Sequence, residues 1–233
     1  RGDKRMERIF DSSPLQALEL LASSLHGMLT NPSTPWFTLR FKQLESLNDD
    51  EAKLWLEEAT EVMYTAFNRS NFQQEIFELY HDLITFGTAA MFVEEDEEDL
   101  IKFSTRHIDE VYVTENEKGK IDTIFRKFHM TSRALVQKFG NNVSQDIQTS
   151  VKKNPYEEIQ IIHAVYPRNE FNPKKKDKAN MPFESVYFEY KNGNELSVSG
   201  FKEFPFVVPR YLKASHEIYG RSPAMTALPD VKM

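Results

Sequence analysis

The sequence predicts an α+β fold, in which N-terminal amphipathic helices are followed by a mostly antiparallel β region with short helices. Two observations carry this prediction. Residues 1–87 contain three stretches in which apolar side chains recur every three or four residues, each preceded by a helix-start signal. From Thr88 onward, short runs of β-branched and aromatic residues alternate with Asp, Glu, Asn and Gly, as strands alternate with turns.

The first helix is predicted to begin at Pro14 and to end near Met28. Ser13 can accept hydrogen bonds from the free amides of a first turn, and Gln16 would complete a capping box. The pair Asn31-Pro32 stops the helix before the aromatic pair that follows Pro35. The predicted apolar stripe comprises Leu15, Leu18, Ala22, Leu25 and Leu29, and the aromatic pair is Trp36 and Phe37.

Two more helices are predicted over Asp49–Phe67 and Asn71–Phe86. Asn48 with Glu51, and Ser70 with Gln73, supply their start signals. Gly87 is expected to end the second of them in the left-handed conformation. The expected buried stripes comprise Ala52, Trp55, Leu56, Ala59, Val62, Met63 and Phe67 in one helix, and Phe72, Ile76, Leu79, Tyr80 and Leu83 in the other.

The β region is predicted to contain antiparallel hairpins with two short helices between them. Asn192-Gly193 is expected to form a tight hairpin turn. The segment Phe204–Tyr211 contains two prolines and should be an edge strand at best, and Ser222-Pro223 should open a last helix. The predicted strands are Ala89–Val93, Leu100–Phe103, Val111–Val113, Ile121–Phe128, Glu158–Tyr166, Phe183–Tyr190 and Leu196–Val198, and the predicted helices are Thr131–Phe139 and Val143–Lys152.

Composition indicates a globular chain whose charge is unevenly distributed. Of the 233 residues, 40% are hydrophobic and 12% aromatic, enough for a core, and none is Cys, which excludes disulfides and thiolate sites. Residues 1–122 hold 12 basic and 25 acidic side chains, whereas residues 123–233 hold 17 and 11. Such asymmetry either favours contact between unlike halves of neighbouring copies or reflects two solvated surfaces that differ. No apolar run of roughly eighteen residues and no secretory leader is present, so no membrane partner is expected.

Recognisable catalytic motifs are missing from the sequence. There is no glycine-rich phosphate loop, no nucleophile elbow, and no pair of histidines at the spacing of a helical zinc site. His163 lies in a predicted strand, where it is either a hydrogen-bonded sheet residue or a ligand or base. We therefore expect no cofactor, no metal and no enzyme activity.

Two charged runs have an ordinary interpretation and a functional one. The acidic run Glu94–Asp99 is either a solvated hairpin tip or a divalent-cation site, although it lacks the alternation of a calcium loop. The basic run is either a solvated loop or a contact for DNA or for a neighbouring subunit. It comprises Lys174, Lys175, Lys176 and Lys178.

Three segments resemble the head-to-tail connector (portal) family of short-tailed, double-stranded-DNA bacteriophages. The first is LLASSLHGMLTNPSTPWF, which ends at Trp36 and Phe37, and the second is the strand Ile161–Arg168. The third combines a YGRSP motif with Ala227–Lys232, similar to the family pattern YGRxP…ALPD[IV]K. The YGRSP residues are Tyr219, Gly220, Arg221, Ser222 and Pro223.

The resemblance implies a ring of usually twelve identical subunits at one capsid vertex. Double-stranded DNA would pass through its channel without sequence specificity, and acidic, non-adhesive walls suit such passage. Terminase, capsid or scaffolding proteins and tail adaptors would be the other partners, in the virion and, during assembly, in the host cytoplasm. Residues 1–87 would be the helical part of the wing, 88–215 its β-rich part, and 216–233 the start of a helix that leads into absent C-terminal parts.

The named residues also have alternatives under this resemblance. Trp36 and Phe37 are either core anchors or a subunit interface. Arg221 either helps to fix the junction into the next segment or is an ordinary surface arginine. Two other functions stay open: a small metal-dependent hydrolase or nuclease that uses Asp109, Glu110 and the acidic run, and a non-viral scaffold that binds a partner helix.

Overall fold

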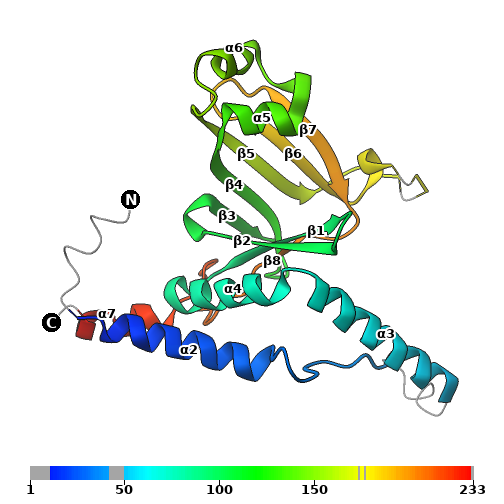
Figure 1. The fold of residues 1–233 in the computed structure, drawn as a ribbon, viewed down its shortest axis with the longest axis vertical. Helices are drawn as coiled ribbons and strands as arrows, with labels where there is room; N and C mark the ends of the chain where they lie inside the picture. Colours follow the sequence, from blue (N-terminus) through cyan, green and yellow to red (C-terminus); the bar gives the residue numbers. More distant parts are fainter. Residues whose placement is uncertain (1–10, 42–49, 173, 176, 232–233) are drawn as a thin grey trace. The chain divides into compact units, whose positions relative to one another are not determined.

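The computed structural model describes residues 11–41, 50–172, 174–175 and 177–231, which form the predicted α+β fold (Figure 1). The chain divides into two compact units, Arg1–Arg106 with Val207–Met233, and His107–Phe206. The predicted ranges 1–87, 88–215 and 216–233 were divided where the type of secondary structure changes, whereas the two units are the parts of the chain that each pack into a compact body. The assignment of those ranges to parts of a portal wing stays a prediction.

Helix α4, Phe72–Phe86, is the central helix of the first unit, and other helices of that unit pack against it. Helix α2, Ser13–Leu29, lies along α4, and α7, Pro223–Val231, also packs against it (Figure 1). The predicted end of α4 is confirmed, because Gly87 adopts φ +79° and its amide donates to the carbonyl of Leu83 at 2.9 Å. The buried core cluster of this unit combines residues of α4 with residues that follow it in the chain. It comprises Phe72, Leu79, Tyr80, Ala89, Met91 and Phe103.

The start of α2 differs from the prediction. The helix begins at Ser13, whose amide and hydroxyl both donate to Oδ1 of Asp11 at 2.9 Å. The hydroxyl is therefore bonded to a carboxylate, and the prediction of a capping box formed by Ser13 and Gln16 is wrong. Ser12 occupies the N-cap position without a side-chain bond. The hydrogen bonds from Ser13 lower the pKa of Asp11. Of the predicted stripe, Leu15 and Leu29 are exposed.

Helix α3, Asp50–Arg69, buries a different edge of its apolar surface from the one predicted. Its expected start signal, Asn48, lies outside the described residues. Trp55 and Val62 are 62% and 69% exposed, whereas Thr60 is buried. The apolar residues of α3 cover so wide an arc that periodicity alone does not select the buried edge. A hydrogen bond fixes which edge of the helix is buried, because Thr60 Oγ1 accepts from the amide of Leu39 at 3.2 Å.

A three-stranded sheet with the order β2-β1-β8 belongs with these helices. Strands β1, Ala90–Asp96, and β2, Leu100–Arg106, form an antiparallel hairpin. The acidic run covers the end of β1 and the exposed tip, where residues 97–99 form the turn as the ordinary interpretation expected. Oδ2 of Asp96 accepts from the amides of Glu98 and Asp99 at 3.1 and 3.0 Å. The predicted edge strand is confirmed as β8, Phe206–Val207, at one side of the sheet.

The second unit is built on a five-stranded antiparallel sheet whose spatial order follows the chain. Helices α5, Ser132–Phe139, and α6, Gln145–Lys153, supply the residues that cover its core (Figure 1). The strands are β3, Val111–Glu115; β4, Ile121–Thr131; β5, Glu158–Pro167; β6, Phe183–Glu189; and β7, Glu195–Phe201. The core comprises Phe128, Leu135, Val143, Ile147, Ile161 and Leu196.

The turn between β6 and β7 is wider than the tight turn predicted at Asn192-Gly193. The amide of Glu189 donates to the carbonyl of Asn194 at 2.9 Å, so residues 190–193 form the loop. Gly193 adopts φ +67°, which explains the glycine. The register shift beside this hairpin accompanies the longer loop.

His163 is a hydrogen-bonded sheet residue, as its ordinary interpretation expected. It is 2% exposed, and its Nε2 lies 2.9 Å from Oγ of Ser185 on the neighbouring strand. Its ring stacks on that of Tyr187 with a centroid separation of 3.9 Å and an interplanar angle of 3°. These contacts account for a polar side chain inside the sheet.

A buried carboxylate ties α6 to the β6–β7 hairpin. Glu189 is 3% exposed, and its oxygens accept from the amide and hydroxyl of Ser144 at 2.9 and 2.8 Å. Nδ2 of Asn194 also donates to Oε1 at 3.0 Å. Burial raises the pKa of Glu189, but the bonds from Ser144, Asn192 and Asn194 outweigh it and hold the pKa below the ordinary value of 4.5.

We predict that Glu189→Gln destabilises the protein by about 1–3 kcal/mol at pH 7, because it weakens charge-assisted bonds to a buried group. The folded-state pKa of Glu189 lies below the unfolded one, so its contribution is present above pH 4.5 and is lost as pH falls through the folded-state pKa. Denaturant unfolding from pH 7 to 3 should show the two proteins converging at acid pH. The exposed Glu195→Gln on the same hairpin is the control, and equal pH profiles for both variants would contradict the prediction.

Candidate functional site

The YGRSP motif lies on the turn that joins α4 to β1. The carbonyl of Gly87 accepts from the amide of Tyr211 at 2.9 Å, and the amide of Ala89 donates to the carbonyl of Pro209 at 3.3 Å. Farther along, the amide of Gly220 donates to the buried hydroxyl of Thr88 at 2.7 Å. The segment that leads to α7 is thus bonded to residues more than a hundred positions earlier.

Two glycines allow this close approach. A Cβ atom on Gly220 would lie 2.2 Å from the carbonyl oxygen of Gly87 and 3.0 Å from Cβ of Arg210. A Cβ atom on Gly87 would lie 2.4 Å from the carbonyl oxygen of Gly220. Neither position has room for a side chain, because the obstructing atoms are mostly backbone. We call Gly87, Thr88, Gly220 and Ser222 the glycine crossing.

Ser222 joins two helices through one hydroxyl. Its Oγ donates to the carbonyl of Thr85 in the last turn of α4 at 2.9 Å. The same oxygen accepts from the amide of Met225 at 2.9 Å, and Pro223 is the first residue of α7. The start signal predicted at Ser222-Pro223 is therefore confirmed.

Arg221 points to the surface beside the crossing. Its guanidinium donates to both carboxylate oxygens of Glu217, at 2.9 Å from Nε and 2.5 Å from Nη2. This hydrogen bonding lowers the pKa of Glu217. Its backbone amide donates to the carbonyl of Leu212 at 2.8 Å. The backbone of Arg221 belongs to the junction, while its side chain is 61% exposed.

The aromatic pair Trp36 and Phe37 is anchored by Tyr64. Oη of Tyr64 accepts from the amides of both residues at 2.6 Å and donates to the carbonyl of Phe37 at 2.8 Å. The Trp36 ring stacks on Phe72 at 5.8 Å, and the Phe37 ring stacks on Tyr64 at 4.5 Å. Both residues are half-buried against the α3 and α4 side chains, which is the arrangement of core anchors.

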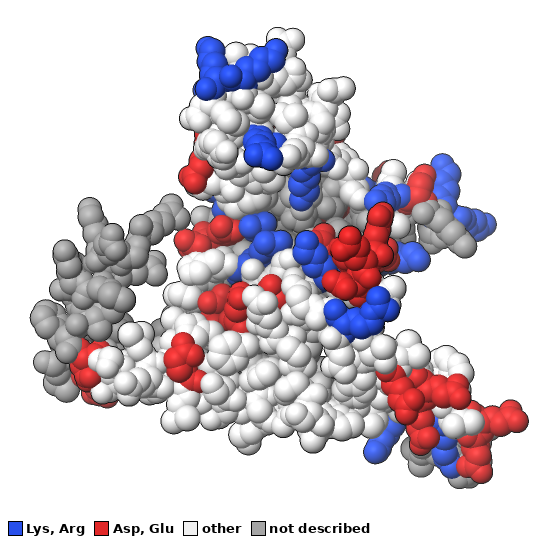
Figure 2. All heavy atoms as spheres, viewed as in Figure 1, with Lys and Arg blue, Asp and Glu red and all other residues white. Residues whose placement is uncertain are grey.

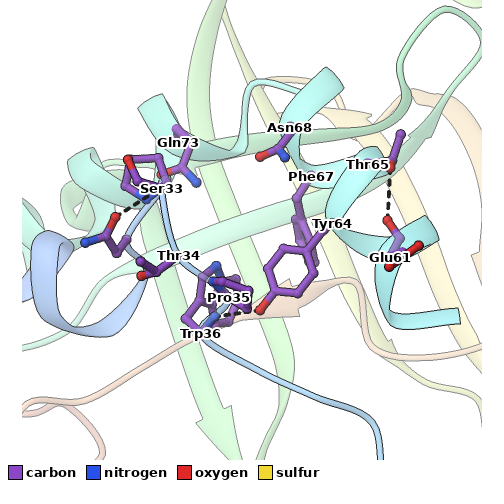
Figure 3. A pocket seen from close by; sticks show the side chains of 12 residues that line it. Ser33, Thr34, Pro35, Trp36, Glu61, Tyr64, Thr65, Phe67, Asn68 and Gln73 are labelled. Carbon is purple, nitrogen blue, oxygen red and sulfur yellow. Dashed lines mark hydrogen bonds between the residues drawn. The ribbon is translucent and has the colours of Figure 1, made fainter. Parts of the chain in front are cut away.

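An open groove lies beside this anchor (Figure 3). Its volume is about 420 Å³, and Trp36, Tyr64 and Phe67 form part of its lining. Among its lining residues, Glu61 is the one carboxylate, and there is no basic side chain.

The basic run follows β5 in a loop that Arg168 holds at its base. The guanidinium of Arg168 donates to the carbonyls of Lys178 and Ser199, each at 3.1 Å, and lies 3.5 Å from a carboxylate oxygen of Glu184. Lys174, Lys175 and Lys178 are exposed, whereas Lys176 lies outside the described residues. A contact with DNA or a neighbouring subunit stays a prediction.

The acidic residues proposed for hydrolysis are engaged locally. Oε2 of Glu110 accepts from Nε of Arg126 at 2.9 Å, and Oδ1 of Asp109 lies 2.6 Å from Nδ1 of His107. Within the described part of the chain, no three His, Asp or Glu side chains are grouped as metal ligands are. None of the described helices has the length and apolarity needed to cross a membrane.

The sequence did not reveal the long-range partners of the glycine crossing or of the aromatic pair Trp36 and Phe37. Gly87 was predictable as a helix end, but nothing in its local sequence indicates that another backbone crosses it. Tyr64 is absent from the predicted stripe of α3. The spacing of Thr60, Tyr64 and Phe67, four and then three residues apart, is the signal that could have found the face on which the aromatic pair lies.

Comparisons with known proteins agree with the resemblance. A family described as bacteriophage head to tail connecting protein matches residues 1–233. The portal protein of Salmonella phage epsilon15 is 35% identical over 237 residues, which cover 100% of this chain and 43% of that protein. The probable portal protein of Bordetella phage BPP-1 is 33% identical over 236 residues, covering 100% of this chain and 42% of that protein. The chain spans less than half the length of these two relatives.

We predict that Gly87→Ala destabilises the protein by about 2–3 kcal/mol or more, because Ala adds both a clash and an unfavourable φ. Gly220→Ala should add the clash alone. Gly193→Ala is the matched control, since Gly193 adopts φ +67° with no atom within 4 Å of an added Cβ. Chemical denaturation measures all three. If Gly87→Ala costs no more than Gly193→Ala, the crossing is not sterically tight.

We also expect Tyr64→Phe to cost about 1–3 kcal/mol, because it removes the only atom of Tyr64 that bonds the amides of Trp36 and Phe37. Unfolding followed by tryptophan fluorescence measures the loss. Tyr156→Phe, at a tyrosine that is 70% exposed, should change stability by less than about 0.5 kcal/mol. Equal effects of the two substitutions would show that the hydroxyl does not hold the aromatic pair.

Proposed function

The chain belongs to the family of bacteriophage head to tail connecting proteins, and we propose that it is part of a portal subunit. The observation that carries this proposal is the similarity of its whole length to two phage portal proteins, at 35% and 33% identity. Their likeness supports a structural role at the junction of phage head and tail.

In this proposal, identical subunits form a closed ring at one capsid vertex, with twelve as the expected number. Double-stranded DNA passes through the channel without sequence specificity. The formal net charge of −7 supports this role, because weak attraction to phosphates lets DNA slide. Terminase, capsid or scaffolding proteins and tail adaptors are the proposed partners. The ring belongs to the virion and is assembled in the host cytoplasm.

The proposed role is structural rather than catalytic. The local engagement of Glu110 by Arg126 supports it, because that carboxylate is already bonded within the fold. The YGRSP segment fits a junction, since it bonds the start of α7 to α4. We propose contacts to DNA or to a neighbour for Lys174, Lys175 and Lys178, and an interface role for Trp36 and Phe37 remains a second proposal.

We predict that the natural gene product containing this chain assembles into rings with a central hole. Native mass spectrometry gives the number of subunits, and negative-stain imaging shows the hole. A nuclease-treated sample is the control, because a ring that persists without nucleic acid is held by protein contacts. Strictly monomeric or dimeric particles at all concentrations would contradict the proposal.

A further inference from the structure

One side of helix α3, centred on Trp55 and Val62, carries apolar side chains that its own unit does not bury. Leu54, Trp55, Val62 and Met63 are 57%, 62%, 69% and 39% exposed. Trp55 and Val62 are seven residues apart and therefore lie on the same side of the helix. Single exposed apolar residues are ordinary on a protein surface, and α2 exposes four as well, so the charge beside Trp55 and Val62 decides what can bind here.

The same helix is strongly acidic. It carries five acidic and two basic side chains, and one of the basic ones, Lys53, pairs with Asp50 at 2.9 Å. Glu57, Glu58 and Glu61 are exposed beside the apolar residues. Figure 2 shows acidic side chains gathered over α3. A partner of this surface must therefore combine apolar contact with positive charge.

The surface of α5 and α6 carries the complementary charge. Between Ser132 and Lys153 the chain has four basic side chains and one acidic one, and Figure 2 shows basic side chains over this region. Lys138 is held over the ring of Tyr187, with Nζ 4.7 Å from its centroid. The exposed basic residues are Arg133, Lys138, Lys152 and Lys153.

We propose that the α3 surface binds the α5–α6 surface of a second copy of this chain. The net charges of the two surfaces are opposite, three negative for α3 and three positive for α5–α6. Trp55 adds a ring face on which a lysine or arginine of the neighbour can lie. Because the two surfaces are different, the contact is head-to-tail, which is the kind of contact that closes a ring. The inference rests on the proposed portal function and adds which surfaces meet.

The apolar half of the contact is tested by Trp55→Ala in the natural gene product. Loss of a buried tryptophan anchor should weaken association between subunits by about thirtyfold, measured as the concentration at which native mass spectra show half assembly. Leu20→Ala is the matched control, because Leu20 is 70% exposed on α2, outside the proposed contact. Circular dichroism and thermal unfolding show that each variant remains folded.

The charged half is tested by mixing two reversed variants. Glu57→Lys with Glu58→Lys, and Lys152→Glu with Lys153→Glu, should each prevent assembly alone, because like charges then face each other. An equimolar mixture should assemble, since each reversed α3 meets a reversed α5–α6 surface of the other variant. Glu97→Lys with Glu98→Lys, at the exposed hairpin tip, is the control and should assemble alone.

The outcomes separate the inference from the proposed function. If the unaltered protein forms rings and the Trp55 and charge-reversed variants do so too, the α3 contact is wrong while the portal proposal stands. If mixing does not rescue the reversed variants, α5–α6 of a neighbour is not the partner. If the unaltered protein never assembles, both proposals are wrong. Rescue by mixing, with assembly by the control, supports the inference.

Discussion

The first unit depends on a place where two backbones meet with no room for a side chain. Gly87 and Gly220 are separated by 133 positions in the sequence, yet an added Cβ on either would lie within 2.4 Å of the other's carbonyl oxygen. This contact sets the distance between the end of α4 and the segment that precedes α7. The bonds of Thr88 and Ser222 depend on that distance, because a hydrogen bond weakens steeply when its atoms move apart.

The sequence indicated the elements of this fold better than their contacts. Helix α4, its glycine cap and the antiparallel sheets were predictable, because periodicity and turn residues are local signals. The cap of α2 was not, because the Ser13 hydroxyl donates to Asp11 instead of accepting from the first turn, and local rules do not rank these two arrangements. The glycine crossing was beyond reach, since long-range pairing leaves no pattern in one sequence.

Helix α3 shows a general reason why such predictions fail. Core and interface use the same apolar residues, so a wide stripe predicts burial without saying whether the chain or a partner provides it. Here Thr60 and Tyr64 fix the inner face through bonds to the 36–39 segment, and Trp55 and Val62 are left outside. Among the candidate site residues, the YGRSP motif was singled out by resemblance and the basic run by its charge, since neither forms a catalytic motif.

The double use of the Ser222 hydroxyl has a mechanical consequence. Its oxygen belongs at once to the first turn of α7 and to the last turn of α4, and the neighbouring amides of Gly220 and Arg221 are bonded as well. A displacement of α7 away from α4 would therefore strain the Ser222 and Gly220 bonds together, because both reach the end of α4. The first turn of α7 and the last turn of α4 are thus coupled through one atom, so a shift of either turn would be passed directly to the other.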